Sequence, residues 1–263
     1  MNRIFLPGLI ILFFNCCHAQ QQFQLDAPML NYTSVFFTGS ATASLKFEQP
    51  GTQIFYTVNN KEPTENDAVY QKPILIKKPQ TTLKAKVFGN GFIPSETIEA
   101  TFIKDGLKIK SIQQTRADEK FPGNGQGTLI DNEGGIADLH NKNFLGYQQD
   151  SVEINITLEK KEKIDSVLLN FLQDHDSWIF LPQEIKVFYF NKKTKAFELM
   201  AKKEISGNTI AKGSSTVFEI VKSPGKLISD KLKIVLKPLQ SLPGGHPGEG
   251  KQSWLFIDEI KIY

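Results

Sequence analysis

Short segments in which hydrophobic and polar residues alternate recur along the chain. Residues 83–87, 152–158, 185–189 and 232–236 each place an aliphatic or aromatic side chain at every second position. A period of two puts successive side chains on opposite faces of a β-strand, so each segment is expected to bury one face. Clusters of Gly, Pro and Asn separate the segments, which is typical of turns. The pattern predicts an all-β fold without long helices.

The pattern divides the chain into two parts at about residue 105. Residues 23–104 contain short strands with short connections, whereas residues 107–263 contain longer Gly-rich loops, notably at 121–127 and 241–250. A chain of 263 residues has enough material for two modest cores. We therefore expect two domains: a small sandwich over 23–104 and, because roughly eight strands are predicted after it, a jelly-roll sandwich over 107–263.

The first nineteen residues have the character of a signal peptide. Arg3 precedes a largely apolar run over residues 4–14, and Cys17-His18-Ala19 offers a small residue for cleavage. The run is too short to span a bilayer as a helix, so no transmembrane segment is expected. We predict export and a mature chain without disulfides. Lipid attachment at Cys16 or Cys17 is the alternative, and Asn15 disfavours it.

Charge excludes one large class of partner. The formal net charge is +3, and the basic residues are spread along the chain. Binding to nucleic acid needs a concentrated basic surface, so a nucleic-acid partner is not expected.

The first domain resembles the chitobiase/β-hexosaminidase C-terminal domain. The resemblance rests on residues 56–64 (YTVNNKEPT) and 81–88 (TTLKAKVF), together with Tyr70 and Pro73-Ile74. Family members usually have Asp-Gly at the turn where this chain has Asn59-Asn60, a change that preserves the turn chemistry. The resemblance implies an immunoglobulin- or fibronectin-like sandwich with an accessory, non-catalytic role.

The second domain is similar to the discoidin, or coagulation factor five/eight type C, domain. The order of its pieces carries this similarity, from an early strand at residues 129–131 to the closing segment at 256–260. Two loop motifs, residues 171–182 and 246–250, look like those of discoidin-type domains that accompany bacterial family 20 glycoside hydrolases. This resemblance implies a galactose-binding-like sandwich that binds carbohydrate through its loops.

Five residues in these two loop motifs are candidates for sugar contact. A pyranose ring has an apolar face and a rim of hydroxyl groups, so its binder needs an exposed aromatic ring beside fixed polar groups. The candidates are Asp174, His175, Asp176, Trp178 and His246. Each also has a simpler interpretation: Trp178 as a plug of the sandwich end, His175 as a turn residue, and the two aspartates as solvated side chains. His246 is expected in an open loop.

The discoidin resemblance also implies a structural calcium ion near the terminal strands. Asp131 and Glu259 match the positions of its carboxylate ligands, which are the oxygen donors that Ca²⁺ prefers. The alternative is that both carboxylates only accept hydrogen bonds from loop amides. Residues 132–135 (NEGG) stand where the family usually has Asp-Gly after the early strand, and this departure counts against the calcium site.

No catalytic motif is evident. The chain has no nucleophile elbow, zinc-binding His pair or phosphate-binding loop. Asp174 with Asp176 has no fixed separation, and Asp258 with Glu259 should point to opposite faces of a strand. We therefore predict a secreted, non-enzymatic glycan-binding protein, accessory to glycan degradation. Its expected partners are N-acetylhexosamine-containing glycans and a glycoside hydrolase. The alternatives are an adhesive surface protein with protein partners and, third, a hexosaminidase-type hydrolase.

Overall fold

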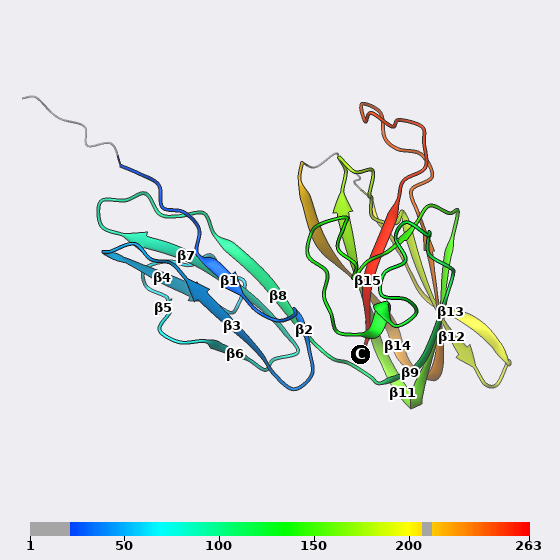
Figure 1. Ribbon diagram of the computed structural model, residues 1–263. Helices are drawn as coiled ribbons and strands as arrows, with labels where there is room; N and C mark the ends of the chain where they lie inside the picture. Colours follow the sequence, from blue (N-terminus) through cyan, green and yellow to red (C-terminus); the bar gives the residue numbers. More distant parts are fainter. Residues whose placement is uncertain (1–21, 207–211) are drawn as a thin grey trace, which may run out of the picture.

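The computed structural model describes residues 22–206 and 212–263 (Figure 1). The predicted signal peptide, with Cys16 and Cys17, lies outside these residues. Strands form nearly all the regular structure of the described residues, and a 3-10 turn, η1 (Thr128–Ile130), takes the place of the early strand expected at residues 129–131. The expected all-β class with two sandwiches is confirmed. No helix in the described ranges has the length and apolar character needed to cross a bilayer.

The first sandwich packs a five-stranded sheet against a three-stranded one. Leu83, Ala85 and Val87 are at most 1% exposed, as their alternation predicts. Asn60 adopts a left-handed φ of 65° in the turn expected at Asn59-Asn60. The larger sheet has the order β2 (Phe36–Phe37), β8 (Ile98–Lys104), β7 (Gln80–Gly89), β4 (Thr52–Thr57), β5 (Ala68–Val69), and the smaller one β1 (Met29–Asn31), β3 (Ala41–Lys46), β6 (Ile74–Ile76).

The second sandwich is built on two long strands, β11 (Val152–Asp174) and β14 (Ser214–Lys237), which pair with each other along their length. In one layer they pair with β9 (Ile109–Gln114) and β12 (Glu184–Asn191), and β12 pairs with β13 (Ala196–Glu204). In the other layer β11 pairs with β15 (Leu255–Ile262), which pairs with β10 (Leu145–Tyr147). Both layers contribute side chains to one large core.

The long strands change layer where their pairing is irregular. Residues 158–161 of β11 lie opposite a single residue of β14, Asp230, and residues 223–226 of β14 lie opposite a single residue of β11, Asp165. Extra residues of this kind bend a strand and increase its twist. The two irregularities therefore form a corner, which Figure 1 shows at the end of the sandwich away from the loop before β15.

The two sandwiches share a small apolar cluster of their own. Phe36 and Ile103 from the first sandwich pack with Leu168 from the second, and all three are at most 3% exposed. Next to it, Tyr263 Oη donates a hydrogen bond to the Lys104 carbonyl over 2.7 Å. Residues before and after the connection at residues 104–107 thus bring the two sandwiches into direct contact.

Candidate functional site

The motif predicted as one loop over residues 171–182 is the end of a strand followed by a tight turn. Residues 171–174 belong to β11, and residues 175–178 form a four-residue loop. Asp174 and Ile179 exchange two backbone hydrogen bonds of 3.0 and 2.9 Å across the loop. The Asp174 carboxylate accepts hydrogen bonds from the amide (3.2 Å) and hydroxyl (2.8 Å) of Ser177. Asp174 therefore holds the turn in shape.

His175 and His246 lie together beneath the surface. His246 Nδ1 accepts a hydrogen bond from the Gly248 amide at 3.0 Å, so its Nε2–H donates to the His175 carbonyl at 2.8 Å. The His175 ring stacks on Phe180 with 4.1 Å between centroids. The expectation that His246 occupies an open loop is wrong, because the loop folds back and leaves 5% of the residue exposed, while His175 is fully buried.

Trp178 is one of two tryptophans at this end of the sandwich, with Trp254, whose backbone amide donates a hydrogen bond to the Trp178 carbonyl. It is half-buried and has a φ of 66°, a backbone conformation rare for a bulky residue. Its indole is edge-on to His246 at 5.9 Å between centroids, and the Lys251 ammonium lies 5.2 Å from the ring centroid. A Cβ at Gly248 would lie 3.0 Å from two indole atoms, so glycine lets the loop at 241–250 approach the ring.

Of the five predicted residues, three reach the surface. Asp176 is exposed, and Asp174 and Trp178 are half-exposed. The two histidines instead support the turn from below. Burial, and then the neighbouring His246 side chain, lowers the pKa of His175, which favours the neutral imidazole near pH 7.

A second cluster of polar residues lies near the chain terminus. One carboxylate oxygen from each of Asp131, Asp258 and Glu259 lies within 4.8 Å of the other two. The expectation that Asp258 and Glu259 point to opposite faces is wrong. Ile257 and Ile260 pair with residues 171 and 169 of β11, so both acidic residues lie opposite Asn170 in a β-bulge.

Two of the three carboxylates of this cluster are removed from water, whereas Asp131 is more exposed. Asp258 and Glu259 are fully buried. Asp258 Oδ2 accepts hydrogen bonds from the Gly135 amide at 2.8 Å and from Asn170 Nδ2 at 3.0 Å, whereas Oδ1 has no protein partner. Burial, with the nearby Glu259 and Asp131 carboxylates, raises the pKa of Asp258 to about 8. Burial likewise raises the pKa of Glu259 to about 7.

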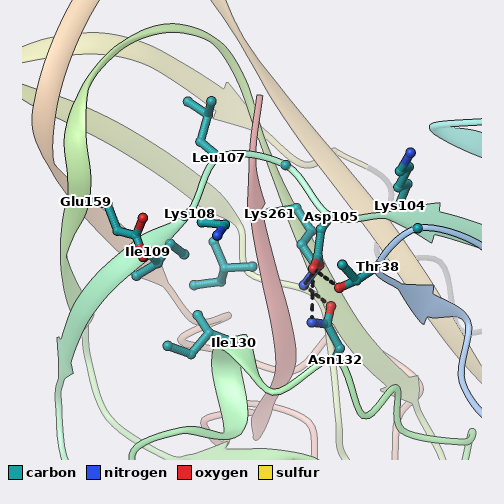
Figure 2. A pocket seen from close by; sticks show the side chains of 13 residues that line it. Thr38, Lys104, Asp105, Leu107, Lys108, Ile109, Ile130, Asn132, Glu159 and Lys261 are labelled. Atoms are coloured by element: carbon teal, nitrogen blue, oxygen red, sulfur yellow. Dashed lines mark hydrogen bonds and ion pairs between the residues drawn. The ribbon is translucent and has the colours of Figure 1, made fainter.

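Lys261 joins this cluster to the connection between the sandwiches, where Figure 2 shows it next to Asp105. Its Nζ lies 2.9 Å from Glu259 Oε1 and 3.0 Å from Asp105 Oδ1. Asp105 also accepts a hydrogen bond from the Asn132 side chain at 3.3 Å and one from Thr38 of the first sandwich. Thr38, Asp105, Asn132 and Lys261 line one side of a cavity of about 390 Å³, and Leu107, Lys108 and Glu159 line another.

The residues present fit a divalent cation of the calcium type. Three carboxylates converge and a single ammonium, shared with Asp105, offsets their charge. Asp258 Oδ1 is a buried acceptor that a cation would satisfy, and carboxylate oxygens are the donors that Ca²⁺ prefers. Asp131, Asp258 and Glu259 would hold such an ion.

Sequence reasoning missed Asp258, Asn170 and Lys261 as members of this cluster. Strand alternation argues against Asp258 and Glu259 as a catalytic pair, and a bulge breaks that alternation. No local signal marks the bulge, because it is defined by the pairing of β15 with β11. The run Asp258-Glu259 followed by Lys261 was the available signal: three charged residues within an otherwise apolar terminal strand.

Several solved structures are similar to part of the chain. A pectin-binding carbohydrate-binding module is 14% identical, with a TM-score of 0.38, over 59% of this chain and 91% of the module. The CBM32 of AlyQ, in complex with 4,5-unsaturated mannuronic acid, is 13% identical, with a TM-score of 0.38, over 60% of this chain and 96% of that one. A GH29 fucosidase from Ruminococcus gnavus, in complex with fucose, is 16% identical, with a TM-score of 0.35, over 58% of this chain and 25% of that one. Likenesses at this level do not assign a function.

The family comparison covers the first sandwich. No curated protein matches the chain. The expected resemblance of the first domain is confirmed, since residues 33–99 match the family model of the chitobiase/beta-hexosaminidase C-terminal domain.

Proposed function

We propose that the chain is an exported, non-catalytic glycan-binding protein, accessory to glycan degradation. The contact surface is the turn at residues 175–178 together with the loop at 241–250. Asp176 and Trp178 touch the sugar, and the two buried histidines position the turn. This retains the predicted set of five residues: two contact the sugar, and the two histidines and Asp174 support the turn.

The observation that carries the proposal is the backbone of Trp178. A left-handed conformation costs a bulky residue roughly 1–2 kcal/mol, and glycine or asparagine would avoid that cost. Strain of this kind is concentrated at functional sites. Here it holds a half-exposed indole against Gly248, with the Lys251 ammonium over the ring. An indole face beside charged and polar side chains suits a pyranose.

Two features support a non-catalytic role. Asp258 and Glu259 converge but are fully buried, so a substrate cannot reach them. The Asp174 carboxylate is engaged by Ser177, which leaves Asp176 as the freely exposed acid of the turn. The matched family is named for chitobiase and β-hexosaminidase, which favours N-acetylhexosamine-containing glycans as ligands and a glycoside hydrolase as partner.

A glycan array probed with the full chain tests this proposal. We expect binding to a set of glycans, weakened at least about fivefold by Trp178→Ala, since removing one stacked ring costs on the order of 1–3 kcal/mol. Phe23→Ala removes another exposed ring, 70% exposed, and should leave binding unchanged. No binding to any glycan, or equal binding by Trp178→Ala, would contradict the proposal. A protein partner recovered in its place would favour an adhesive role.

The proposal includes a structural calcium ion held by Asp131, Asp258 and Glu259. A ligand at a hundred times its dissociation constant stabilises the fold by about 2.7 kcal/mol. We expect Ca²⁺ to raise the melting temperature relative to EDTA by several degrees, roughly 5–10 °C for a domain of this size. Asp258→Asn should abolish the difference. Asp26→Asn, at an exposed position, should retain it. Equal melting temperatures with Ca²⁺ and EDTA would count against the ion.

A further inference from the structure

The corner of the second sandwich carries a basic pocket of about 420 Å³. The pocket is bounded by the corner of β11 and β14 and by the turn between β12 and β13. Its lining includes four lysines and no acidic residue: Lys161, Lys192, Lys193 and Lys226. The whole chain has a net charge of only +3, so this concentration is local.

The fold brings these lysines together from three segments. Lys161 lies in the irregular stretch of β11, and Lys226 lies in the irregular stretch of β14. Lys192 and Lys193 follow β12 in the turn, where the Lys193 amide donates to Asn191 Oδ1 at 2.9 Å. All four side chains are exposed. Like charges gathered in a concavity attract an anion.

One of the four charges is compensated within the protein. Lys192 Nζ lies 3.1 Å from Asp230. Within residues 22–206 and 212–263, the other three lysines have no carboxylate at salt-bridge distance. Three ammonium groups are therefore available to a ligand.

The wall of the pocket is aromatic and held in place. Tyr189 and Phe190 are half-buried and line the pocket. Tyr189 Oη donates to Glu198 at 2.7 Å, and the same carboxylate accepts both a hydrogen bond from Asn191 at 2.9 Å and one from Thr194 at 2.7 Å. These bonds fix the turn that carries Lys192 and Lys193.

We propose that this pocket is a second ligand site, specific for an anionic polysaccharide that carries carboxylate or sulfate groups. The ammonium groups pair with the anionic substituents, and the aromatic wall packs against the sugar ring. A concave site admits a projecting substituent, whereas a flat lipid surface does not enter it. Ile228, 57% exposed, is the one strongly exposed aliphatic residue of the lining, which is too little for membrane insertion. This site does not depend on the proposed function of Trp178.

Affinity electrophoresis of the full chain in gels containing dextran sulfate, polygalacturonate or neutral dextran tests the proposal. We expect retardation by one or both anionic polymers and none by dextran. The triple variant Lys161→Glu, Lys193→Glu, Lys226→Glu should bind at least about tenfold more weakly. A second triple variant with Gln at these positions should also weaken binding, and thermal melting checks that both variants fold.

The control is a triple charge reversal elsewhere. Lys72→Glu, Lys77→Glu, Lys78→Glu changes the net charge by the same amount on exposed positions of the first sandwich and should retain binding. Trp178→Ala should also retain it, which separates this site from the proposed glycan site. Loss of binding in the control triple variant equal to the loss in the Lys161, Lys193 and Lys226 variants would overturn the proposal. So would tighter binding to phosphatidylglycerol vesicles or to a single-stranded oligonucleotide than to either polymer.

Discussion

Trp178 illustrates how one residue can be held in an unfavourable backbone conformation by its neighbours. The four-residue loop between Asp174 and Ile179 ends with a left-handed residue, and the sequence places a tryptophan there. The Trp178 carbonyl accepts a hydrogen bond from the Trp254 amide at 2.9 Å, and the indole packs against Gly248. These contacts offset the strain.

Two substitutions separate the strain from the packing. Trp178→Ala loses the indole contacts and keeps the left-handed strain, whereas Trp178→Gly loses the same contacts and relieves it. We expect the glycine variant to be about 1 kcal/mol more stable than the alanine variant in urea denaturation. At Asp176, an exposed position without a positive φ, the same pair should show no advantage for glycine. An alanine variant of Trp178 as stable as the glycine variant would show that the position carries no strain.

At the residue scale, the sequence indicates which residues meet but not which are exposed. The motifs at 171–182 and 246–250 were assigned to one site, and His246 does contact His175 and Trp178. Their use in sugar binding stays a prediction. The burial of His246 could not be predicted, because Gly245 and Pro247 indicate a turn and the contact that covers the ring comes from 71 positions away.

The bulge in β15 is the element on which the acidic cluster depends. It places Asp258 and Glu259 opposite one residue, Asn170, and Asn170 donates to Asp258 from the facing strand. The cluster therefore depends on a polar side chain in a strand that is otherwise apolar on both sides at residues 167–172.

Removing the Asn170 amide tests this dependence. Asn170→Val leaves a buried carboxylate with one hydrogen-bond donor fewer, at a cost of about 1–3 kcal/mol. Asn155→Val, on the same strand, removes only a hydrogen bond to the partly exposed Glu153 and should cost less than about 1 kcal/mol. Urea denaturation measures both. Equal costs would mean that Asn170 has no special role in holding Asp258.

At the element scale, a strand with one buried face can be predicted from its alternating residues, whereas a strand buried on both faces cannot. Residues 152–158 alternate and form a strand with one buried face, as expected. Residues 167–172 are buried throughout, so their pattern shows no period of two, and the sequence alone predicts a loop motif at the end of β11. The irregular pairing of β11 with β14 depends on contacts between distant residues, which a single sequence does not display.

For the whole molecule, the junction between the sandwiches is apolar on one side and ionic on the other. Phe36, Ile103 and Leu168 are buried together. Lys261 pairs with Asp105 next to them, and its Nζ lies 5.4 Å from the centroid of the Phe36 ring. The predicted boundary at residues 104–106 is therefore not a free linker, since Asp105 is bound to Thr38, Asn132 and Lys261.

The junction should couple the unfolding of the two sandwiches. We expect a single calorimetric transition for the full chain and two transitions for Phe36→Ala, since losing a buried phenylalanine costs about 3–5 kcal/mol. Phe37→Ala removes the neighbouring ring from the first core and leaves the junction intact. It should lower the temperature of a single transition. Two transitions in the unaltered chain would show that the sandwiches unfold independently.

The continuity of β11 and β14 has a mechanical consequence. The same two strands run from the corner to the end that carries the Trp178 turn, so no hinge separates one end of the second sandwich from the other. If each end of the second sandwich binds a different polymer, the rigid sandwich would keep the two polymers a fixed distance apart. A surface that displays both polymers would then retain the protein longer than a surface that displays only one of them.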